Sequence, residues 1–253
     1  MRWFDLSGKK AMVTGAGRGL GKGMAEGFME AGVETVIFAT TDKILAMAQE
    51  YRNRGYKCHG VAADLGDEAS RQEGFRRALE MLGGKIDILV NSAGIQRRHK
   101  SEEFPLEDWN EVLEINLTAT FRMCQMAARE MISQGSGKII NVASMISFFG
   151  GFTIPAYAAS KGGVAQLTKA FCNEWAGYGI NVNAIAPGYM ATEMNTALLD
   201  PANPRYKEIT DRIPAHRWGT PEDMQGVALF LASPASDYLN GAIIPVDGGY
   251  LVR

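Results

Sequence analysis

Short apolar segments alternate along this 253-residue chain with longer segments of helical periodicity, and this alternation restricts the fold more than any other feature. Two of the short segments, 86–90 and 139–142, are apolar at most positions, as expected for strands covered on both faces. Strands that alternate with helices form βαβ units, in which successive strands run parallel. The sequence therefore predicts an α/β protein built on a mainly parallel sheet.

The sequence predicts seven strands and six helices along the chain. The strands are expected at 10–14, 35–39, 58–62, 86–91, 138–143, 181–186 and 243–246. The helices are expected at 19–31, 42–54, 68–82, 107–133, 157–176 and 221–231. No repeat or linker interrupts them, so we predict a single domain over residues 1–253, a Rossmann-type, doubly wound parallel sheet of about seven strands with helices on both faces. The loosest stretch, 189–218, carries three prolines and is predicted to be an irregular substrate lid.

Charge and composition argue against several classes of protein. The formal net charge is -2 and no long run of like charge occurs, so a nucleic-acid binder is not expected. The N-terminal residues lack the apolar run of a signal peptide, and no later segment approaches the roughly 20 apolar residues of a membrane span. Cys58, Cys124 and Cys172 lie far apart and are expected to be buried, reduced thiols. We expect a cytoplasmic protein that works in solution.

A glycine-rich turn, Thr14-Gly15-Ala16-Gly17-Arg18-Gly19-Leu20-Gly21, follows the first expected strand and opens the first helix. Glycines in such a turn let backbone N–H groups approach a pyrophosphate at the helix N-terminus. A plain strand-to-helix connection would explain the glycines alone, but their place between the first strand and the first helix favours dinucleotide binding. The spacing is G-x-x-x-G-x-G rather than the more usual G-x-G-x-x-G.

Four polar residues predict the chemistry. Tyr157 and Lys161 are four apart in an expected helix and therefore project from one face. An ammonium beside a phenol favours the phenolate, so we expect Lys161 to lower the pKa of Tyr157 from about 10 toward working pH. Such a tyrosine can take a proton from an alcohol, or return one to a ketone, while hydride moves to or from a nicotinamide. Ser144 can hold the reacting oxygen, and Asn116 completes a set whose members, singly, all have ordinary structural explanations.

These motifs are similar, over essentially the whole chain, to those of the short-chain dehydrogenase/reductase family. The glycine turn matches the family's T-G-x-x-x-G-x-G motif, and Asn91-Ser92-Ala93-Gly94 matches N-N-A-G with Ser92 in place of the second Asn. The residues that match the catalytic tetrad are Asn116, Ser144, Tyr157 and Lys161. The resemblance implies that Asn116 positions a proton-relay water and that Lys161 also holds the nicotinamide ribose.

The resemblance also implies a set of cofactor-binding residues. They are Gly15, Gly17, Arg18, Gly19, Leu20, Gly21, Thr40, Asp64, Leu65, Asn91, Ala93, Gly94, Tyr157, Lys161, Pro187, Gly188, Met190 and Thr192. The choice of cofactor is expected at the end of the second strand, where an acid would bind the ribose 2′-OH. Ala39 or Thr40 occupies that place, and no arginine is there for a 2′-phosphate. We therefore favour NAD, while Arg18 keeps NADP open.

Two segments that flank the expected cleft indicate the substrate. Residues 95–99 follow the fourth strand and residues 213–219 close the expected lid, and the arginines in both suit a carboxylate, although solvated basic loops would look the same. Both segments resemble those of sugar-acid dehydrogenases that act on 2-deoxy-D-gluconate or 2-dehydro-3-deoxy-D-gluconate in pectin and uronate breakdown. The expected substrate residues are Gln96, Arg97, Arg98, Ser144, Met145, Tyr157 and Arg217.

Several alternatives stay open. The same chemistry would serve gluconate at C5, a polyol or a 3-oxoacyl thioester, although a thioester reductase would prefer NADPH and expose a basic patch. A non-catalytic sensor of dinucleotides is a further possibility, but it would be free to lose Tyr157 or Lys161. No metal site is predicted, because His59, His99 and His216 lack the spacing of ligands. By the resemblance, the helices at 107–133 and 157–176 would pair between the subunits of a homotetramer.

Overall fold

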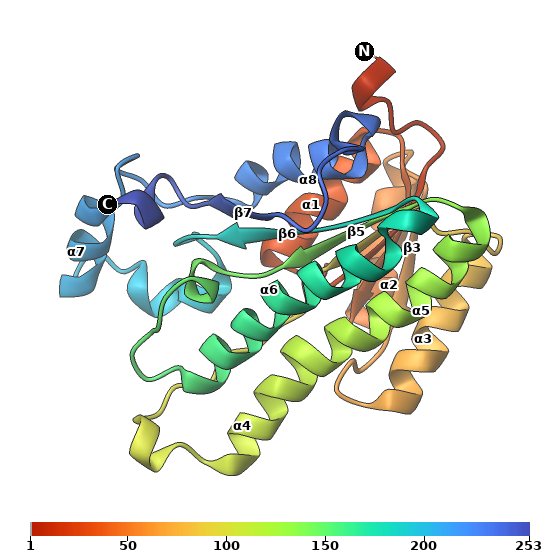
Figure 1. The fold of residues 1–253 in the computed structure, drawn as a ribbon. Helices are drawn as coiled ribbons and strands as arrows, with labels where there is room; N and C mark the ends of the chain where they lie inside the picture. Colours follow the sequence, from red (N-terminus) through yellow and green to blue (C-terminus); the bar gives the residue numbers. More distant parts are fainter. Residues whose placement is uncertain (1) are drawn as a thin grey trace.

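The computed structural model describes residues 2–253, apart from the side chain of Arg2. Within these residues seven parallel strands form one sheet in the order β3-β2-β1-β4-β5-β6-β7. The strands are β1 Lys10–Thr14, β2 Glu34–Ala39, β3 Cys58–Ala62, β4 Ile88–Asn91, β5 Gly137–Val142, β6 Ile180–Pro187 and β7 Ile243–Val246. The carboxyl end of β6 points toward α7 (Pro204–Arg212), which marks the edge of the sheet where the site lies (Figure 1).

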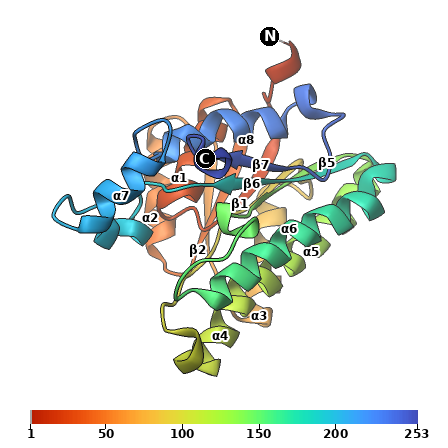
Figure 2. The ribbon, with the colours of Figure 1, turned by 60° about the vertical axis from the view of Figure 1, so that its left-hand side comes forward.

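Helices cover both faces of the sheet (Figures 1 and 2). On one face lie α1 Gly19–Glu30, α2 Lys43–Asn53 and α8 Gln225–Ala232. On the other lie α3 Glu68–Met81, α5 Ala119–Gln134 and α6 Pro155–Trp175, with α4 Leu106–Leu113 running into α5 and packing beside α6. The predicted doubly wound α/β fold is thereby confirmed.

The alternation of side chains along β1 explains why the sheet needs cover on both faces. Ala11 and Val13 pack into the core beneath α1, whereas Met12 between them packs into the core beneath α5, because successive side chains of a strand point to opposite faces. All three side chains are fully buried. A run of consecutive apolar residues in this sequence therefore contributes alternate side chains to the two cores, one on each face of the sheet.

The structure differs from the predicted elements in two places. The helix expected at 107–133 is interrupted by a π-helical turn, Glu114–Thr118, between α4 and α5. The stretch 189–218 is not irregular, because it contains a 3₁₀ segment, Glu193–Leu198, and α7. Its prolines misled the prediction: Pro204 is the first residue of α7, where a missing N–H costs nothing, and the Asn203 side chain caps the helix by accepting from Arg205 N at 3.0 Å.

Two further expectations bear on the chain as a whole. Cys58 and Cys124 are buried and Cys172 is partly buried, and all three are free thiols. Within residues 2–253, no helix has both the length and the apolar character needed to cross a membrane.

The strand order reverses between β1 and β4, and a crevice opens there at the carboxyl ends of the strands. Thr14, the last residue of β1, closes the seam below this crevice. Its hydroxyl donates to Val90 O at 3.4 Å and accepts from the backbone N of Ser92 and Ala93 at 3.0 and 3.2 Å. One side chain therefore fixes the loop after β4 against the glycine turn after β1.

A buried guanidinium holds the other wall of the crevice in place. Arg71 of α3 is 2% exposed and donates to Leu65 O at 2.6 Å, to Glu114 Oε1 at 2.8 Å and to Glu68 Oε2 at 2.7 Å. It thereby joins the loop after β3 to the π-helical turn. A buried charge is tolerated when its hydrogen bonds are satisfied in this way.

We predict that Arg71→Leu lowers the free energy of unfolding by about 1–3 kcal/mol, because it leaves the buried Leu65 O without its donor, whereas Glu114 can turn to solvent. Urea unfolding measures the change. Arg76→Leu is the matched control: Arg76 lies on the same helix, is more than half exposed and pairs only with Glu73 and Glu80, so it should cost less than about 1 kcal/mol. Equal losses in the two variants would contradict the role given to Arg71.

Candidate active site

A cavity of about 750 Å³ opens at the carboxyl ends of the central strands. Most of the predicted cofactor residues line it. Those that do are Gly15, Gly17, Arg18, Gly19, Leu20, Gly21, Thr40, Asp64, Leu65, Ala93, Gly94, Tyr157, Lys161, Pro187, Gly188, Met190 and Thr192. Ser144 lines the same cavity, so the glycine turn and the predicted reacting residues share one space.

The glycine turn has the shape needed to receive a pyrophosphate. Gly15 and Gly19 have φ of +64° and +54°, and a Cβ at Gly15 would lie 2.7 Å from Ala93 Cα. A Cβ at Gly21 would collide with the carbonyl oxygen of Gly15. Arg18 precedes α1 and gives its first turn no side-chain cap, so the N–H groups there are left for an anion. These residues fit a dinucleotide.

The adenosine end of the cavity contains residues that the sequence analysis missed. Beside Thr40, the cavity is lined by Thr41, by Lys43 at the start of α2, and by Ile115 of the π-helical turn. No carboxylate stands at the end of β2, where Ala39 is the last residue. In the sequence Lys43 is a basic residue two positions after Thr41, but an early position in the helix expected at 42–54 explains it equally well.

The segment after β6 faces the glycine turn across the mouth of the cavity. A Cβ at Gly19 would lie 3.7 Å from Thr192 Cγ2, and the next residue, Glu193, forms an ion pair with Arg18 at 2.9 Å. Both charged side chains are about two-thirds exposed. Arg18, predicted to bind the cofactor, is thus paired with an acid.

Ser144 and Lys161 are fixed by a single turn after β5. Ser144 caps the 3₁₀ turn Met145–Ser147, and its hydroxyl accepts from Ile146 N at 3.2 Å. The hydroxyl of Ser147 donates to Lys161 O at 2.7 Å and so fastens this turn to α6. Tyr157 and Lys161 lie on α6 as the spacing predicted, with Lys161 Nζ 5.7 Å from the centre of the Tyr157 ring.

Asn116 lies in the π-helical turn and is fully buried, and both polar atoms of its side chain make hydrogen bonds. Its Oδ1 accepts from Ile95 N at 2.8 Å, and its Nδ2 donates to Ile95 O at 3.0 Å and to Ser160 Oγ at 3.1 Å. These bonds join the loop after β4 to α6. The backbone carbonyl of Asn116 accepts from Thr120 Oγ1 at 2.9 Å.

The electrostatics of the pair differ from the prediction. Burial raises the pKa of Tyr157, and the hydrogen bond from Ser144 and the charge of Arg98 offset this only in part. Burial also lowers the pKa of Lys161, to about 8, because its ammonium has no carboxylate partner within residues 2–253 and instead donates to Val142 O at 2.6 Å. The pKa of Tyr157 is thus raised by burial and not lowered as expected from Lys161.

Asn91 does not reach the cavity. Its side chain is buried between strands and helices, where Nδ2 donates to Asn141 Oδ1 at 2.9 Å and to Cys124 Sγ at 3.1 Å. Its Oδ1 has no hydrogen-bond partner within the described residues. The side chain thus joins β4 to β5 and α5, and the assignment of Asn91 to the cofactor-binding residues stays a prediction.

Of the three predicted substrate arginines, two form ion pairs with acids of the described chain and one does not. Arg97 Nη2 pairs with Glu111 Oε2 at 2.8 Å, and Arg217 forms a two-pronged pair with Asp223 at 2.6 and 2.8 Å. Arg217 holds the pKa of Asp223 down at about 2. Arg98 makes no ion pair or side-chain hydrogen bond to any residue of the described chain, and its charge acts on Tyr157. Acids thus pair with both Arg97 and Arg217, and their role as carboxylate binders stays a prediction.

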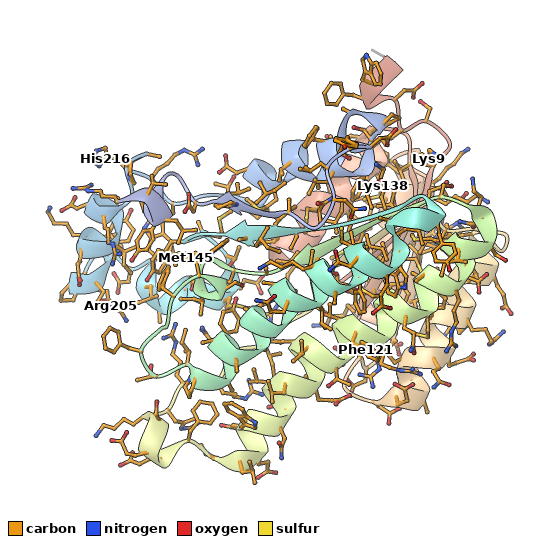
Figure 3. All side chains as sticks on the ribbon, in the orientation of Figure 1. Lys9, Phe121, Lys138, Met145, Arg205 and His216 are labelled. Atoms are coloured by element: carbon orange, nitrogen blue, oxygen red, sulfur yellow. The ribbon has the colours of Figure 1, made fainter. Side chains whose placement is uncertain are left out.

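Met145 and Gln96 border the site without lining the cavity. Met145 is buried with Trp218 and Tyr250 in a small core beneath α7, and Figure 3 shows it between α7 and α6, at the end of the molecule opposite Lys9 and Lys138. Gln96 lies in the loop after β4, between Ile95 and Arg97.

Known proteins share this fold and these motifs. The model of the short chain dehydrogenase family matches residues 9–203. The 2-dehydro-3-deoxy-D-gluconate 5-dehydrogenase of Dickeya dadantii is 48% identical, over 99% of this chain and 98% of its own, and that of Bacillus subtilis is 46% identical, over 99% and 97%. The crystal structure of a gluconate 5-dehydrogenase from Burkholderia cenocepacia, in complex with NADP and tartrate, has a TM-score of 0.95 and 42% identity, covering 100% of this chain and 98% of that one.

The chain therefore belongs to the short-chain dehydrogenase family. It is an oxidoreductase that uses NAD or NADP and acts on CH–OH groups.

We predict that Lys161→Met stabilises the unliganded fold by about 1–3 kcal/mol at pH 7, because a buried ammonium is removed. The pKa of this lysine falls from 10.5 in the unfolded chain to about 8 in the fold, so its charge destabilises the fold fully below about pH 8 and not at all above about pH 10.5. Urea unfolding at both extremes of pH measures the effect. Lys169→Met, on an exposed position of the same helix, should change stability by less than about 0.5 kcal/mol.

Proposed function

We propose that the protein catalyses reversible hydride transfer between a nicotinamide cofactor and a secondary alcohol of a deoxy sugar acid, of the 2-deoxy-D-gluconate or 2-dehydro-3-deoxy-D-gluconate type. The observation that carries this proposal is that Ser144, Tyr157 and Lys161 line the same cavity as the glycine turn, with the free Arg98 acting on Tyr157. Relatives that are 46–48% identical over nearly the whole chain are dehydrogenases of such a sugar acid.

Tyr157 is the proposed acid and base. When bound, NAD or NADP supplies the acceptor or donor of the hydride. Tyr157 takes the hydroxyl proton of the alcohol in one direction and returns it to the ketone oxygen in the other. Ser144 holds the same oxygen by a hydrogen bond and, by bonding to Tyr157, lowers the pKa that burial raises. Lys161 holds the nicotinamide ribose, and the Asn116 carbonyl holds a water through which the proton leaves.

Arg98 is the proposed partner of the substrate carboxylate. Its guanidinium is exposed and has no protein acceptor within the described residues; it does not line the cavity, but its charge favours the ionised form of Tyr157. A guanidinium binds a carboxylate through two parallel hydrogen bonds, which orients the substrate as well as attracting it. A sugar acid bound at Arg98 would extend its chain of hydroxyls toward Tyr157.

The segment 189–218 is the proposed substrate lid within a single domain. Its two ends are pinned together, because Ala191 N donates to Gly219 O at 2.7 Å and Gly219 N donates to Tyr189 O at 3.0 Å. Between these ends Ile209 and Ile213 are buried in a small core that the segment shares with Met145 and Tyr250. Such a closed loop can move as a unit over the sheet edge.

For the cofactor we continue to favour NAD, because Glu193 occupies the guanidinium of Arg18. Lys43, Thr40 and Thr41 offer a 2′-phosphate one ammonium and two hydroxyls, so NADP is the alternative. The NADP in the Burkholderia cenocepacia structure supports that alternative.

Gluconate oxidised at C5 is the second candidate substrate. It carries the same carboxylate for Arg98 and differs by hydroxyls along the chain. The gluconate 5-dehydrogenase of Gluconobacter oxydans, 41% identical over 98% of this chain and 97% of its own, favours it. We further propose a cytoplasmic homotetramer that acts in pectin and uronate breakdown, with exposed apolar residues such as Leu106 and Phe152 at its contacts.

Absorbance at the reduced-nicotinamide band tests the function directly. With 2-deoxy-D-gluconate, 2-dehydro-3-deoxy-D-gluconate, gluconate and a panel of polyols, each offered with NAD and NADP, we expect fastest reduction of NAD by a deoxy sugar acid. Turnover of neutral polyols with none of any sugar acid would overturn the substrate class and leave the reaction class intact.

We predict that Tyr157→Phe lowers turnover by about 10²–10⁴-fold, since it removes only the proton-transferring hydroxyl. Affinity for NADH, measured by fluorescence titration, should stay within about twofold, because the cradle for the cofactor is untouched. Tyr178→Phe, at a half-exposed position outside the cavity, is the control and should turn over normally. Retained turnover in the first variant would remove Tyr157 from the mechanism.

A further inference from the structure

The turn that follows β7 packs directly against the C-terminal end of the proposed lid. Gly248 and Gly249 have φ of +64° and +91°. A Cβ on Gly248 would lie only 2.8 Å from Ile213 Cγ2, and Ala215 N donates to Gly248 O at 3.0 Å. A Cβ on Gly249 would lie 3.0 Å from Pro214 Cγ. Because glycine adopts positive φ freely and has no side chain, these two residues let the end of the chain approach the lid closely.

Tyr250 is the next residue, and it has a well-defined place. It begins a 3₁₀ turn, Tyr250–Val252, and is 5% exposed. The carboxylate of Asp247 fixes this turn by accepting from Gly249 N and Leu251 N, both at 2.8 Å. Asp247 directly follows β7, which is paired in register with β6. The position of the Tyr250 ring is therefore set by the sheet.

The Tyr250 ring contacts two segments that come from different strands. From the lid, Arg212 Cζ lies over its face, 4.3 Å from the ring centre, and the Tyr189 ring meets it edge-on at 5.3 Å. From the turn after β5, the Phe149 ring stacks on it at 6.2 Å. A cation over a ring face and edge-on or stacked rings are all favourable arrangements. One side chain therefore joins the lid to the turn after β5.

Both of these segments line the cavity. Ser144, at the start of the turn after β5, lines it, and so does Met190, next to Tyr189 in the lid. Met145, which follows Ser144, is buried with Tyr250 in the small core beneath α7, and Figure 3 places it between α7 and α6. Tyr250 does not line the cavity. It contacts the neighbours of residues that do.

The lid is thus attached at two places by different interactions. At its neck, backbone hydrogen bonds among Tyr189, Ala191 and Gly219 hold its two ends together. At α7, it is held by contacts with the Tyr250 ring and by burial of apolar side chains in the shared core. A smaller side chain at position 250 leaves the neck bonds intact, so it should loosen α7 and leave the cofactor-lining start of the segment in place.

We propose that Tyr250 is a positioning residue, which holds the lid against the turn of Ser144 and so determines where α7 lies above that turn. The inference rests on the proposed function in one respect, since it takes residues 189–218 to be the substrate lid. Because Tyr250 acts through Met145, Phe149 and the lid, its loss should weaken binding of the substrate rather than binding of the cofactor or the chemical step.

Three variants test the proposal: Tyr250→Leu, Tyr250→Phe and, as the matched control, Tyr51→Leu. Tyr250→Phe keeps the ring and removes only its hydroxyl. Tyr51 of α2 is also 5% exposed, and its ring meets Arg54 Cζ at 5.5 Å and the Tyr56 ring at 6.4 Å. It belongs neither to the cavity lining nor to the core beneath α7, so its change removes a similar ring from elsewhere in the fold.

Amide hydrogen exchange, without substrate, measures the attachment of the lid. In Tyr250→Leu we expect about 10-fold faster exchange in α7 and in residues 145–149, with unchanged exchange in β6 and α1. Tyr250→Phe should exchange like the wild type, and Tyr51→Leu should leave α7 unchanged. If Tyr250→Leu does not fold, Arg212→Gln removes the cation from the same ring at an exposed position, and should speed exchange of α7 about 2- to 5-fold.

Steady-state kinetics gives a second readout, which a merely structural role would not move. With 2-deoxy-D-gluconate, or with whichever alcohol the wild-type protein oxidises, Tyr250→Leu should raise KM about 3- to 10-fold. Its kcat should stay within about threefold and its affinity for NADH within about twofold, because the groups that carry out the reaction stay in place. Tyr250→Phe should restore the wild-type KM, and Tyr51→Leu should not change it.

The outcomes separate this proposal from the proposed function. Unchanged exchange of α7 in the Tyr250→Leu and Arg212→Gln variants would overturn the positioning role. Faster exchange over the whole chain, or an equal rise of KM in Tyr51→Leu, would overturn it too, because the ring would then support the fold in general. Faster exchange of α7 with an unchanged KM would refute both the positioning role and the lid. A wild-type protein inert toward sugar acids would refute the proposed substrate, while exchange and the KM for another alcohol would still decide on Tyr250.

Discussion

Thr14 lies where the strand order reverses, and its hydrogen bonds fix the two loops that border the cavity. Parallel strands bring all their carboxyl ends to one edge, and a crevice forms only where the order turns outward in both directions. At that point the Thr14 hydroxyl bonds to β4 and to the loop after it. The glycine turn and the Ala93-Gly94 loop are thus held as two sides of one opening, and the cavity follows from their separation.

Above this seam, the reacting groups are placed by a second set of bonds that does not involve the sheet. The Asn116 side chain hydrogen-bonds to the backbone N and O of Ile95 and to Ser160 on α6. The Ser147 hydroxyl joins the turn that carries Ser144 to the backbone of Lys161. Burial favours the neutral form of Tyr157, whereas Lys161, with its pKa lowered to about 8, still carries most of its charge at pH 7. The site thus depends on positive charge brought near the phenol, which Arg98 already provides in part.

The sequence predicted the sheet well because a buried parallel strand leaves a strong local signal, and each of the seven lies within two residues of its expected place. The tetrad was recognisable for a similar reason, since a fixed spacing of four on α6 survives folding. What remained hidden depends on partners distant in the chain. The partners of Arg97 and Arg217 are nearer, 14 and 6 residues along the chain, but both lie in the next helical segment, and the spacing alone does not show which acid folds back on which arginine. The π-helical turn at Glu114–Thr118 has no local signature, because Arg71, more than 40 residues earlier, holds its first residue.

The pinned neck between Tyr189 and Gly219 separates two kinds of change that a sequence can undergo. Since the two ends bond to each other, the residues between them can change without altering the register of β6 or the seam at Thr14, provided that Met190 and Thr192 still line the cavity and the core shared with Met145 and Tyr250 stays filled. The part of the protein that covers the substrate can thereby change independently of the residues that carry out the reaction. A fold arranged like this can acquire new substrates while Ser144, Tyr157 and Lys161 stay where they are.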